Sequence, residues 1–142
     1  MLAEIKDILE NGVDYESMYY DLTDLIQDKE IHEGFEAFTR GEKIVFLLEM
    51  FIFEVNNGGF DQYLIEQDGI YTLECIELLK KVDLHELSNL LEKAAEVNDS
   101  GIDEGEMIDK LNHLSDEFYN VVDYDDYYLK VMTFVKNNLD LF

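Results

Sequence analysis

Residues 54–63, EVNNGGFDQY, break the most apolar helical run of the chain and restart a helical pattern at once. The run that leads into them, residues 44–55, is apolar nearly all round and therefore belongs in a core. Glycine readily adopts the left-handed backbone that ends a helix, and asparagine tolerates it. We therefore predict a sharp reversal at residues 56–59, after which Phe60 and Tyr63 fold back onto the apolar helix.

The same stretch also admits a functional interpretation. Glu54, Asn57 and Asp61 carry polar groups of the kind that an acid–base or metal site uses. No histidine or nucleophile stands nearby in the sequence, whereas Asp61 is placed to interact with the exposed N–H groups of the second helix. The sequence favours a structural corner over a site.

Helical periodicity extends over the rest of the chain. Apolar residues recur at i, i+3, i+4 and i+7, and alternating strand patterns are absent. Thr39 and Glu42 predict a capping box at the start of the apolar helix, and Asp83 predicts a cap at the start of a later one. We predict an all-α fold, with about seven or eight helices in a single compact domain over residues 1–142.

The charge is the outlying property of the sequence. The formal net charge is -24 and the pI is about 4.1. Contacts with phosphates need clustered Lys and Arg, so direct binding to nucleic acid or to an anionic membrane is excluded. The charge favours a basic partner or cations. An adaptation to salt, or a generally acidic proteome, would explain the same charge without any partner.

Cysteine usage and apolar runs indicate the compartment. Cys75 is the single cysteine, so no internal disulfide can form, and a reducing environment is expected. No basic segment followed by an apolar run opens the chain. The longest apolar stretch is interrupted by Glu49 and Glu54 and is shorter than the ~20 residues of a membrane span. These features predict a cytoplasmic protein.

The corner motif also carries a resemblance. Its residues resemble the signature of the DNA-mimic-protein-type domain, a bacterial family otherwise of unknown function: Glu54, Asn57, Gly58, Gly59, Phe60, Gln62, Tyr63 and Gly69. The likeness extends over about residues 38–142 and leaves the N-terminal helices, residues 1–37, outside it. The resemblance implies an all-helical, often dimeric protein, and a founding member that imitates the charge of DNA to occupy a DNA-binding protein.

Acidic side chains near the C-terminus form the predicted partner-binding surface. They are Asp99, Asp103, Glu104, Glu106, Asp109, Asp116, Glu117, Asp123, Asp125 and Asp126, with Lys110 as the one base among them. Tyr124 and Tyr128 have core spacing, which leaves Tyr127 as the more exposed tyrosine and a candidate contact. A second acidic surface is predicted from Asp7, Glu10, Asp14, Asp21, Asp24 and Asp28. A solvated helix face is the alternative for each segment.

Catalytic and metal-binding patterns are missing from the sequence. The three histidines are scattered, and neither an HExxH motif nor paired cysteine ligands occur. The loop that begins at Asp99 lacks the glycine and glutamate that an EF-hand calcium loop requires. Cys75 stands in an apolar helical stretch and is expected to be buried and inert. We predict no catalytic residues, no metal and no cofactor.

The leading hypothesis is an acidic inhibitor that binds the basic, nucleic-acid-facing surface of a DNA- or RNA-binding protein. An immunity protein or antitoxin that neutralises a cognate toxin would use a similar acidic surface and is the first alternative. The further alternative is an acidic domain without a dedicated partner, whose charge serves solubility. A homodimer is expected from the resemblance alone.

Overall fold

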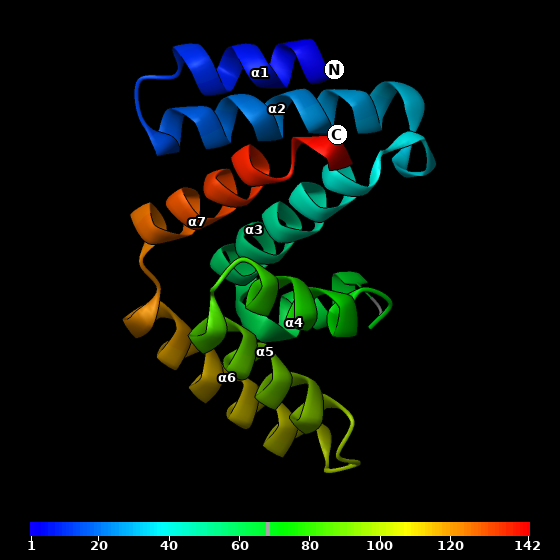
Figure 1. Cartoon of the computed structure of the whole chain (residues 1–142). Helices are drawn as coiled ribbons and strands as arrows, with labels where there is room; N and C mark the ends of the chain where they lie inside the picture. The colour runs from blue at the N-terminus through cyan, green and yellow to red at the C-terminus, as the bar shows by residue number, and fades with distance from the viewer. Residues whose placement is uncertain (68) are drawn as a thin grey trace. The chain divides into compact units, whose positions relative to one another are not determined.

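The computed structural model describes the backbone of every residue except Asp68 and the side chains of all residues except Gln67 and Asp68. Within that part of the chain the regular structure is entirely helical, which confirms the all-α prediction (Figure 1). The helices are α1 (Leu2–Asn11), α2 (Tyr15–Glu33), α3 (Arg40–Gln67), α4 (Thr72–Lys81), α5 (His85–Asn98), α6 (Glu104–Val121) and α7 (Tyr124–Asn137), with short 3-10 helices η1 (Phe35–Ala37) and η2 (Leu139–Leu141). None of the described helices has the length and apolar character of a bilayer span.

The chain divides into two compact units. Unit 1 contains Met1–Glu49 and Asp123–Phe142, and unit 2 contains Met50–Val122. One boundary between them falls within α3 and the other falls between α6 and α7. A single domain over residues 1–142 stays a prediction.

Unit 1 is built around α2, which packs on α1 and on α7. Buried residues of α2, Tyr19, Leu22 and Ile26, supply its part of the core. Val131 and Val135 of α7 are fully buried in the same unit. The segments at the two ends of the sequence therefore share one apolar core.

Unit 2 is built from α4, α5 and α6 together with the part of α3 from Met50 onward. The Ser88 hydroxyl on α5 donates a hydrogen bond of 2.7 Å to the Ile76 carbonyl on α4, inside the core. Leu79 of α4 and Leu91 of α5 are fully buried in the same unit. The bond fixes α5 against α4 at a defined register.

The predicted capping box at the start of α3 is confirmed. The Thr39 hydroxyl accepts from the Glu42 N–H, and the Glu42 carboxylate accepts from the Thr39 N–H, each at 3.2 Å. Glu42 is 0% exposed, and the Lys29 ammonium reaches both of its carboxylate oxygens at 3.0 Å. A buried carboxylate is compensated in this way by a base from α2.

The predicted cap at Asp83 is wrong. Residue Leu84, and not Asp83, holds the N-cap position of α5, and it makes no side-chain cap hydrogen bond. Asp83 instead adopts a positive φ of 65° in the tight turn after α4. Aspartate tolerates that left-handed conformation better than most residues, which explains its place in the turn.

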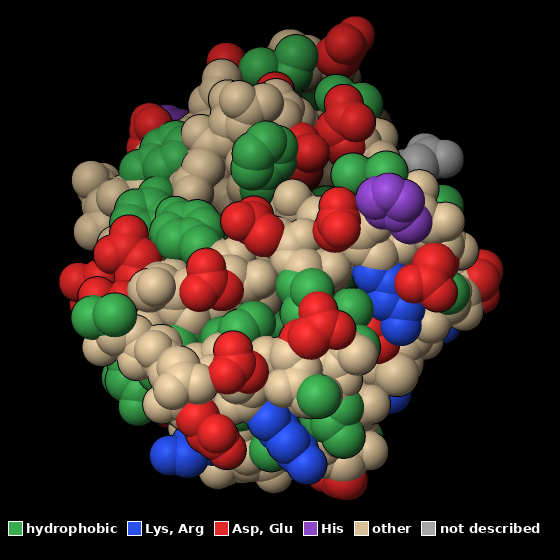
Figure 2. Space-filling view, turned by 90° about the horizontal axis from the view of Figure 1, so that it is seen from above, with side chains coloured by type: hydrophobic (Ala, Val, Ile, Leu, Met, Phe, Trp, Pro, Cys, Tyr) green, Lys and Arg blue, Asp and Glu red, His purple; other side chains and the backbone are tan. Residues whose placement is uncertain are grey.

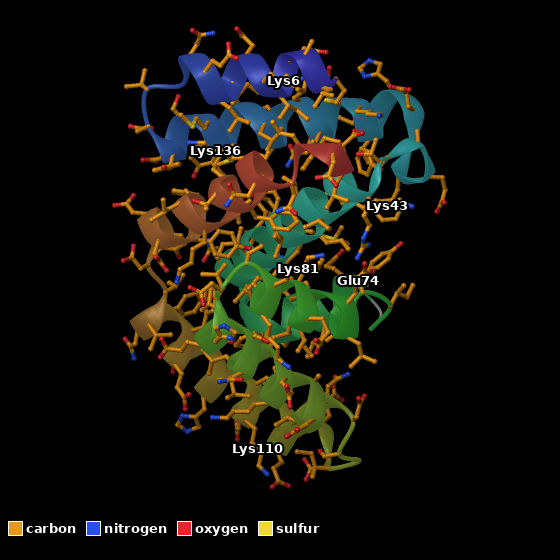
Figure 3. All side chains as sticks on the ribbon, viewed as in Figure 1. Lys6, Lys43, Glu74, Lys81, Lys110 and Lys136 are labelled. Atoms are coloured by element: carbon orange, nitrogen blue, oxygen red, sulfur yellow. The ribbon has the colours of Figure 1, made fainter. Side chains whose placement is uncertain are left out.

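The Lys29–Glu42 pair gives a first prediction. Replacing Lys29 with Met leaves the Glu42 carboxylate buried without its cation and should lower the free energy of unfolding by about 3 kcal/mol. Urea denaturation measures the change. Lys6→Met, at an exposed lysine of α1 (Figure 3), is the control and should stay within about 0.5 kcal/mol of the parent protein. Equal losses in both variants would contradict the assignment.

Candidate partner-binding surfaces

The break in the helix predicted at residues 56–59 is found as a kink at a single residue. Gly59 alone leaves helical geometry inside α3, with φ 82° and ψ -174°, a region that is open essentially only to glycine. Asn56, Asn57 and Gly58 stay helical. The Gln62 amide donates to the Glu54 carboxylate at 2.7 Å, so the two ends of the motif are joined across the kink.

Two residues of α6 satisfy backbone groups at the kink. The Phe60 N–H donates to the Ser115 hydroxyl at 3.0 Å, and that hydroxyl donates to the Leu111 carbonyl at 2.9 Å. One turn further along α6, the Tyr119 hydroxyl donates to the Val55 carbonyl at 2.6 Å. Neither residue was predicted from the sequence, because a serine and a tyrosine at i, i+4 spacing carry no signal of a partner more than fifty residues away.

The aromatic residues of the motif face the core, as predicted. The Phe51 ring lies 5.4 Å from the Tyr63 ring and 6.5 Å from the Phe60 ring, between centroids. Phe118 of α6 completes the cluster, 5.9 Å from Phe60. Burial raises the pKa of the nearby Cys75 thiol to about 12, which makes the thiolate scarce and the cysteine unreactive. These contacts support a structural role for the motif.

No cluster of histidine, cysteine and carboxylate side chains in the described part of the chain has the arrangement of a metal site. The Glu54 carboxylate already accepts a hydrogen bond from the Gln62 amide, and Asn57 is exposed. Gly69 adopts a φ of 70° in the exposed turn between α3 and α4. The geometry therefore supports the corner interpretation of the motif over an acid–base constellation.

Seven of the acidic residues predicted to bind a partner lie in unit 2. All of them are exposed: Asp99, Asp103, Glu104, Glu106, Asp109, Asp116 and Glu117. Asp103 caps α6 by accepting from the Glu106 N–H at 3.0 Å. Asp109 and Asp116 are separated by about 10 Å along the helix, and Lys110 and His113 stand between them in the sequence. The acidic face of α6 is therefore interrupted.

The remaining predicted residues lie in unit 1, where they meet carboxylates from the other end of the chain. Asp123 caps α7, accepting from the Asp126 N–H at 3.1 Å, and Asp14 caps α2, accepting from the Ser17 N–H at 2.8 Å. The two helix starts border one depression, which is lined by Asp14, Tyr15, Glu16, Asp123, Asp125, Asp126 and Leu129. We call it the α2–α7 depression. The two acidic sets predicted separately meet there.

The acidic character continues along α2. Asp21, Asp24 and Asp28 follow one another at helical i, i+3 and i+4 spacing, which puts them on one side of the helix. All three are exposed. Figure 2, seen from the α1–α2 side, shows carboxylates spread over the surface, with basic side chains at few places. The Lys130 ammonium lies 2.9 Å from the carboxylate of Asp126, one of the residues that line the depression.

The prediction that Tyr127 is the exposed tyrosine is wrong. Its side chain is fully buried and its hydroxyl donates to the Leu48 carbonyl at 2.6 Å, within unit 1. Tyr128 is also buried, whereas Tyr124 is 38% exposed. The reason is that α7 packs with a broad apolar face that includes both central tyrosines, while Tyr124 is the first residue of the helix. Tyr124 is therefore the better candidate for a contact.

A tyrosine and carboxylate network lies behind the acidic surface of unit 1. The Tyr19 hydroxyl donates to the Glu49 carboxylate, and the Tyr20 and Tyr128 hydroxyls are 2.9 Å apart. Burial raises the pKa of Glu49, and the nearby Asp24 carboxylate raises it further, while the Tyr19 hydrogen bond opposes them. Glu49 is thus an acidic residue whose charge the fold disfavours.

Comparison with known proteins places these features in a family. The model of the DMP19-like protein family matches residues 36–138. The match covers most of the chain, and the chain belongs to this family, which is the DNA-mimic family that the motif resembles. No curated protein and no solved structure matches the chain. The matched residues include the kink, α6 and α7, whereas α1 and α2 precede them.

The kink gives a second prediction. Gly59→Ala should destabilise the protein by at least about 2 kcal/mol, because alanine is strained at this φ and ψ. Its Cβ would also lie 2.8 Å from the Ser115 hydroxyl. Thermal unfolding followed by circular dichroism measures the loss. Gly105→Ala is the control, since the nearest atom to that Cβ is 3.4 Å away and the change should stabilise α6 by up to about 1 kcal/mol.

Glu49 gives a prediction about pH. Its pKa is raised on folding, so protonation favours the folded state, and this contribution is lost as the pH rises through the folded pKa. Glu49→Gln should therefore raise Tm at pH 7, and the gain should shrink as the pH is lowered through the pKa of Glu49. Exposed Glu36→Gln removes the same formal charge and corrects for general repulsion. A gain that is independent of pH, or equal in both variants, would refute the prediction.

Proposed function

We propose that this member of the DMP19-like family binds the basic surface with which a DNA- or RNA-binding protein holds nucleic acid, and blocks that surface. The observation that carries the proposal is the group of carboxylates from both ends of the sequence that unit 1 brings together around the α2–α7 depression, in a chain with a net charge of -24. Family membership supports the same conclusion, since the family is one of DNA mimics.

Charge spacing decides where docking is assigned. Duplex DNA carries one negative charge per ~1.7 Å of axis, whereas acidic neighbours at i, i+3 or i+4 on a helix are about 5–6 Å apart. The row on α2 is therefore too sparse by itself. At the Asp14 end, Glu16 and the three α7 carboxylates add to it around the α2–α7 depression. We assign docking to this end of unit 1.

The carboxylates at this end are also held in place. Asp14 and Asp123 each accept a hydrogen bond from a backbone N–H, so their side chains are ordered before any partner arrives. Preordering lowers the entropy lost on binding. Each capping aspartate keeps its negative charge while it satisfies the helix start, so one residue serves both the fold and the proposed contact.

Capture from a lysate of the native host at low ionic strength tests the function. The immobilised protein should retain one dominant DNA- or RNA-binding protein, which both salt and added duplex DNA displace. Retention of a toxin would replace the proposal with the immunity or antitoxin alternative. If nothing binds beyond what a charge-matched acidic control protein retains, the charge is generic and the proposal fails.

The assigned docking end gives a further prediction. A triple variant, Asp123→Asn, Asp125→Asn and Asp126→Asn, should weaken binding to the captured partner by about ten-fold at low salt and flatten its salt dependence. Asparagine also caps helices, so α7 should stay intact, and circular dichroism checks this. Isothermal titration measures the affinity.

The matched control removes the same charge from α6 in unit 2. Asp109→Asn, Asp116→Asn and Glu117→Gln change three exposed carboxylates that lie outside the α2–α7 depression. This control should weaken binding less than the α7 triple variant. A larger loss in the α6 variant would move the docking surface to unit 2.

A further inference from the structure

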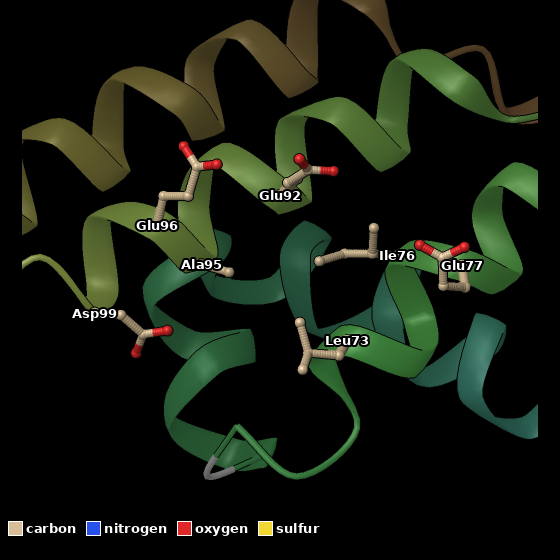
Figure 4. Close-up of a pocket in the computed structure, with 7 residues that line it drawn as sticks. All are labelled: Leu73, Ile76, Glu77, Glu92, Ala95, Glu96 and Asp99. Atoms are coloured by element: carbon tan, nitrogen blue, oxygen red, sulfur yellow. The ribbon is translucent and has the colours of Figure 1, made fainter.

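A groove in unit 2 combines an apolar floor with a rim of carboxylates. It lies between α4 and α5, and Leu73, Ile76 and Ala95 form its middle (Figure 4). Four carboxylates surround that floor, from Glu77, Glu92, Glu96 and Asp99. Of these four, only Asp99 was among the predicted contact residues.

The floor exposes an aliphatic side chain. Leu73 is 76% exposed, while its neighbour Ile76 is buried in the core of unit 2. Leaving a leucine side chain in water forgoes most of the free energy that its full burial would contribute. Lone exposed apolar residues are common, but this one lies in a groove between two fixed helices and within a ring of charge. A ligand that covers Leu73 would recover that burial.

The rim is charged unevenly. Lys80 lies 3.3 Å from the Glu77 carboxylate and 3.8 Å from that of Glu92, so it partly neutralises this side. Glu96 and Asp99 form no ion pair with any Lys or Arg of the described residues. The Ser88 hydrogen bond to Ile76 holds the two walls together beneath the rim. A cationic group is therefore favoured most beside Glu96 and Asp99.

We propose that the α4–α5 groove binds a basic amphipathic segment of a protein partner, with an aliphatic or aromatic side chain over Leu73 and Lys or Arg beside Glu96 and Asp99. This inference rests on the proposed function, because the partner is the same basic protein. Charge complementarity selects this occupant. In a dimer with a two-fold axis through the groove, the rim carboxylates of one copy would face the rim carboxylates of the other, and these like charges repel.

The groove adds a property that charge alone does not supply. Long-range electrostatic attraction acts on every basic protein. It raises the association rate more than it discriminates between partners. An apolar contact at a defined distance from two carboxylates rejects basic surfaces that lack a matching side chain. The groove thus distinguishes one basic partner from the many that carry similar charge.

Two synthetic peptides test the inference on the full chain. One carries lysines with leucines at helical spacing, and the other has the same lysines with every leucine replaced by serine. The leucine peptide should bind about ten-fold more tightly. In amide NMR spectra it should shift the signals of residues 73, 76, 95 and 99. Equal affinity of the two peptides, or shifts confined to unit 1, would overturn the proposal.

Matched variants separate the groove from general charge. Leu73→Gln should abolish the preference for the leucine peptide, whereas Ile31→Gln, at an isoleucine of α2 that is 74% exposed, should keep it. Both sites are on the surface, so folding should survive. Loss of the preference in both variants, or in neither, would refute the proposal. Groove signals that shift with protein concentration alone would assign the groove to a second copy instead.

The peptide experiment tests the groove and the capture experiment tests the proposed function, so either proposal can be refuted without the other. If the lysate yields no nucleic-acid-binding protein but the leucine preference depends on Leu73, the proposed function fails and the groove stands. If such a protein is captured but the peptides bind equally, the function stands and the groove is refuted.

Discussion

The kink at Gly59 is the constraint on which the rest of unit 2 depends. A straight α3 would carry Phe60 and Tyr63 away from Phe51, and the aromatic cluster with Phe118 would not form. The kink in turn needs α6, because the Ser115 hydroxyl accepts from the Phe60 N–H there. A local preference of glycine and a long-range hydrogen bond thus support the same structure, as expected of a sequence that specifies one fold.

Some of the many acidic residues stabilise the fold itself. Three aspartates, Asp14, Asp103 and Asp123, cap the helices α2, α6 and α7, where free N–H groups and the helix dipole favour negative charge. Glu42 caps α3 while buried and needs Lys29 beside it. Burial therefore keeps Glu42 from any partner, whereas the three capping aspartates stay exposed. Asp21 and Asp24, which cap nothing, are free of these structural duties.

Local signals in the sequence predicted the helical fold well, but they could not predict hydrogen bonds between distant segments. The 3.6-residue period, the Thr39–Glu42 box and the glycines of the corner act over a few residues, so they can be read directly. The pairing of Ser115 and Tyr119 with the kink joins distant segments and has no local mark. The burial of Tyr127 was missed because the apolar face of α7 is wider than the stripe assumed.

The candidate surfaces show the same difference between features with a local sequence signal and features without one. The sequence supplied the acidic residues of α7 and of α2, but not that their helix starts share one depression. The half-burial of Glu49 did have a signal, since a glutamate in a run that is apolar nearly all round must lie partly against the core. No sequence signal predicts the groove between α4 and α5. The residues of its rim come from two helices, each of which has the pattern of an ordinary amphipathic helix.

Charge and apolar contact act at different ranges, and the proposed interaction uses both. In the proposed interaction, the exposed carboxylates act over about a Debye length, close to 8 Å at physiological salt, and would govern encounter with a basic protein. The apolar floor of the α4–α5 groove acts only on contact and would govern how long the complex lasts. Rising salt screens the first effect and leaves the second nearly intact. A mimic that offered charge alone would release its partner wherever salt releases DNA, whereas one with an apolar contact keeps its partner under conditions in which DNA dissociates.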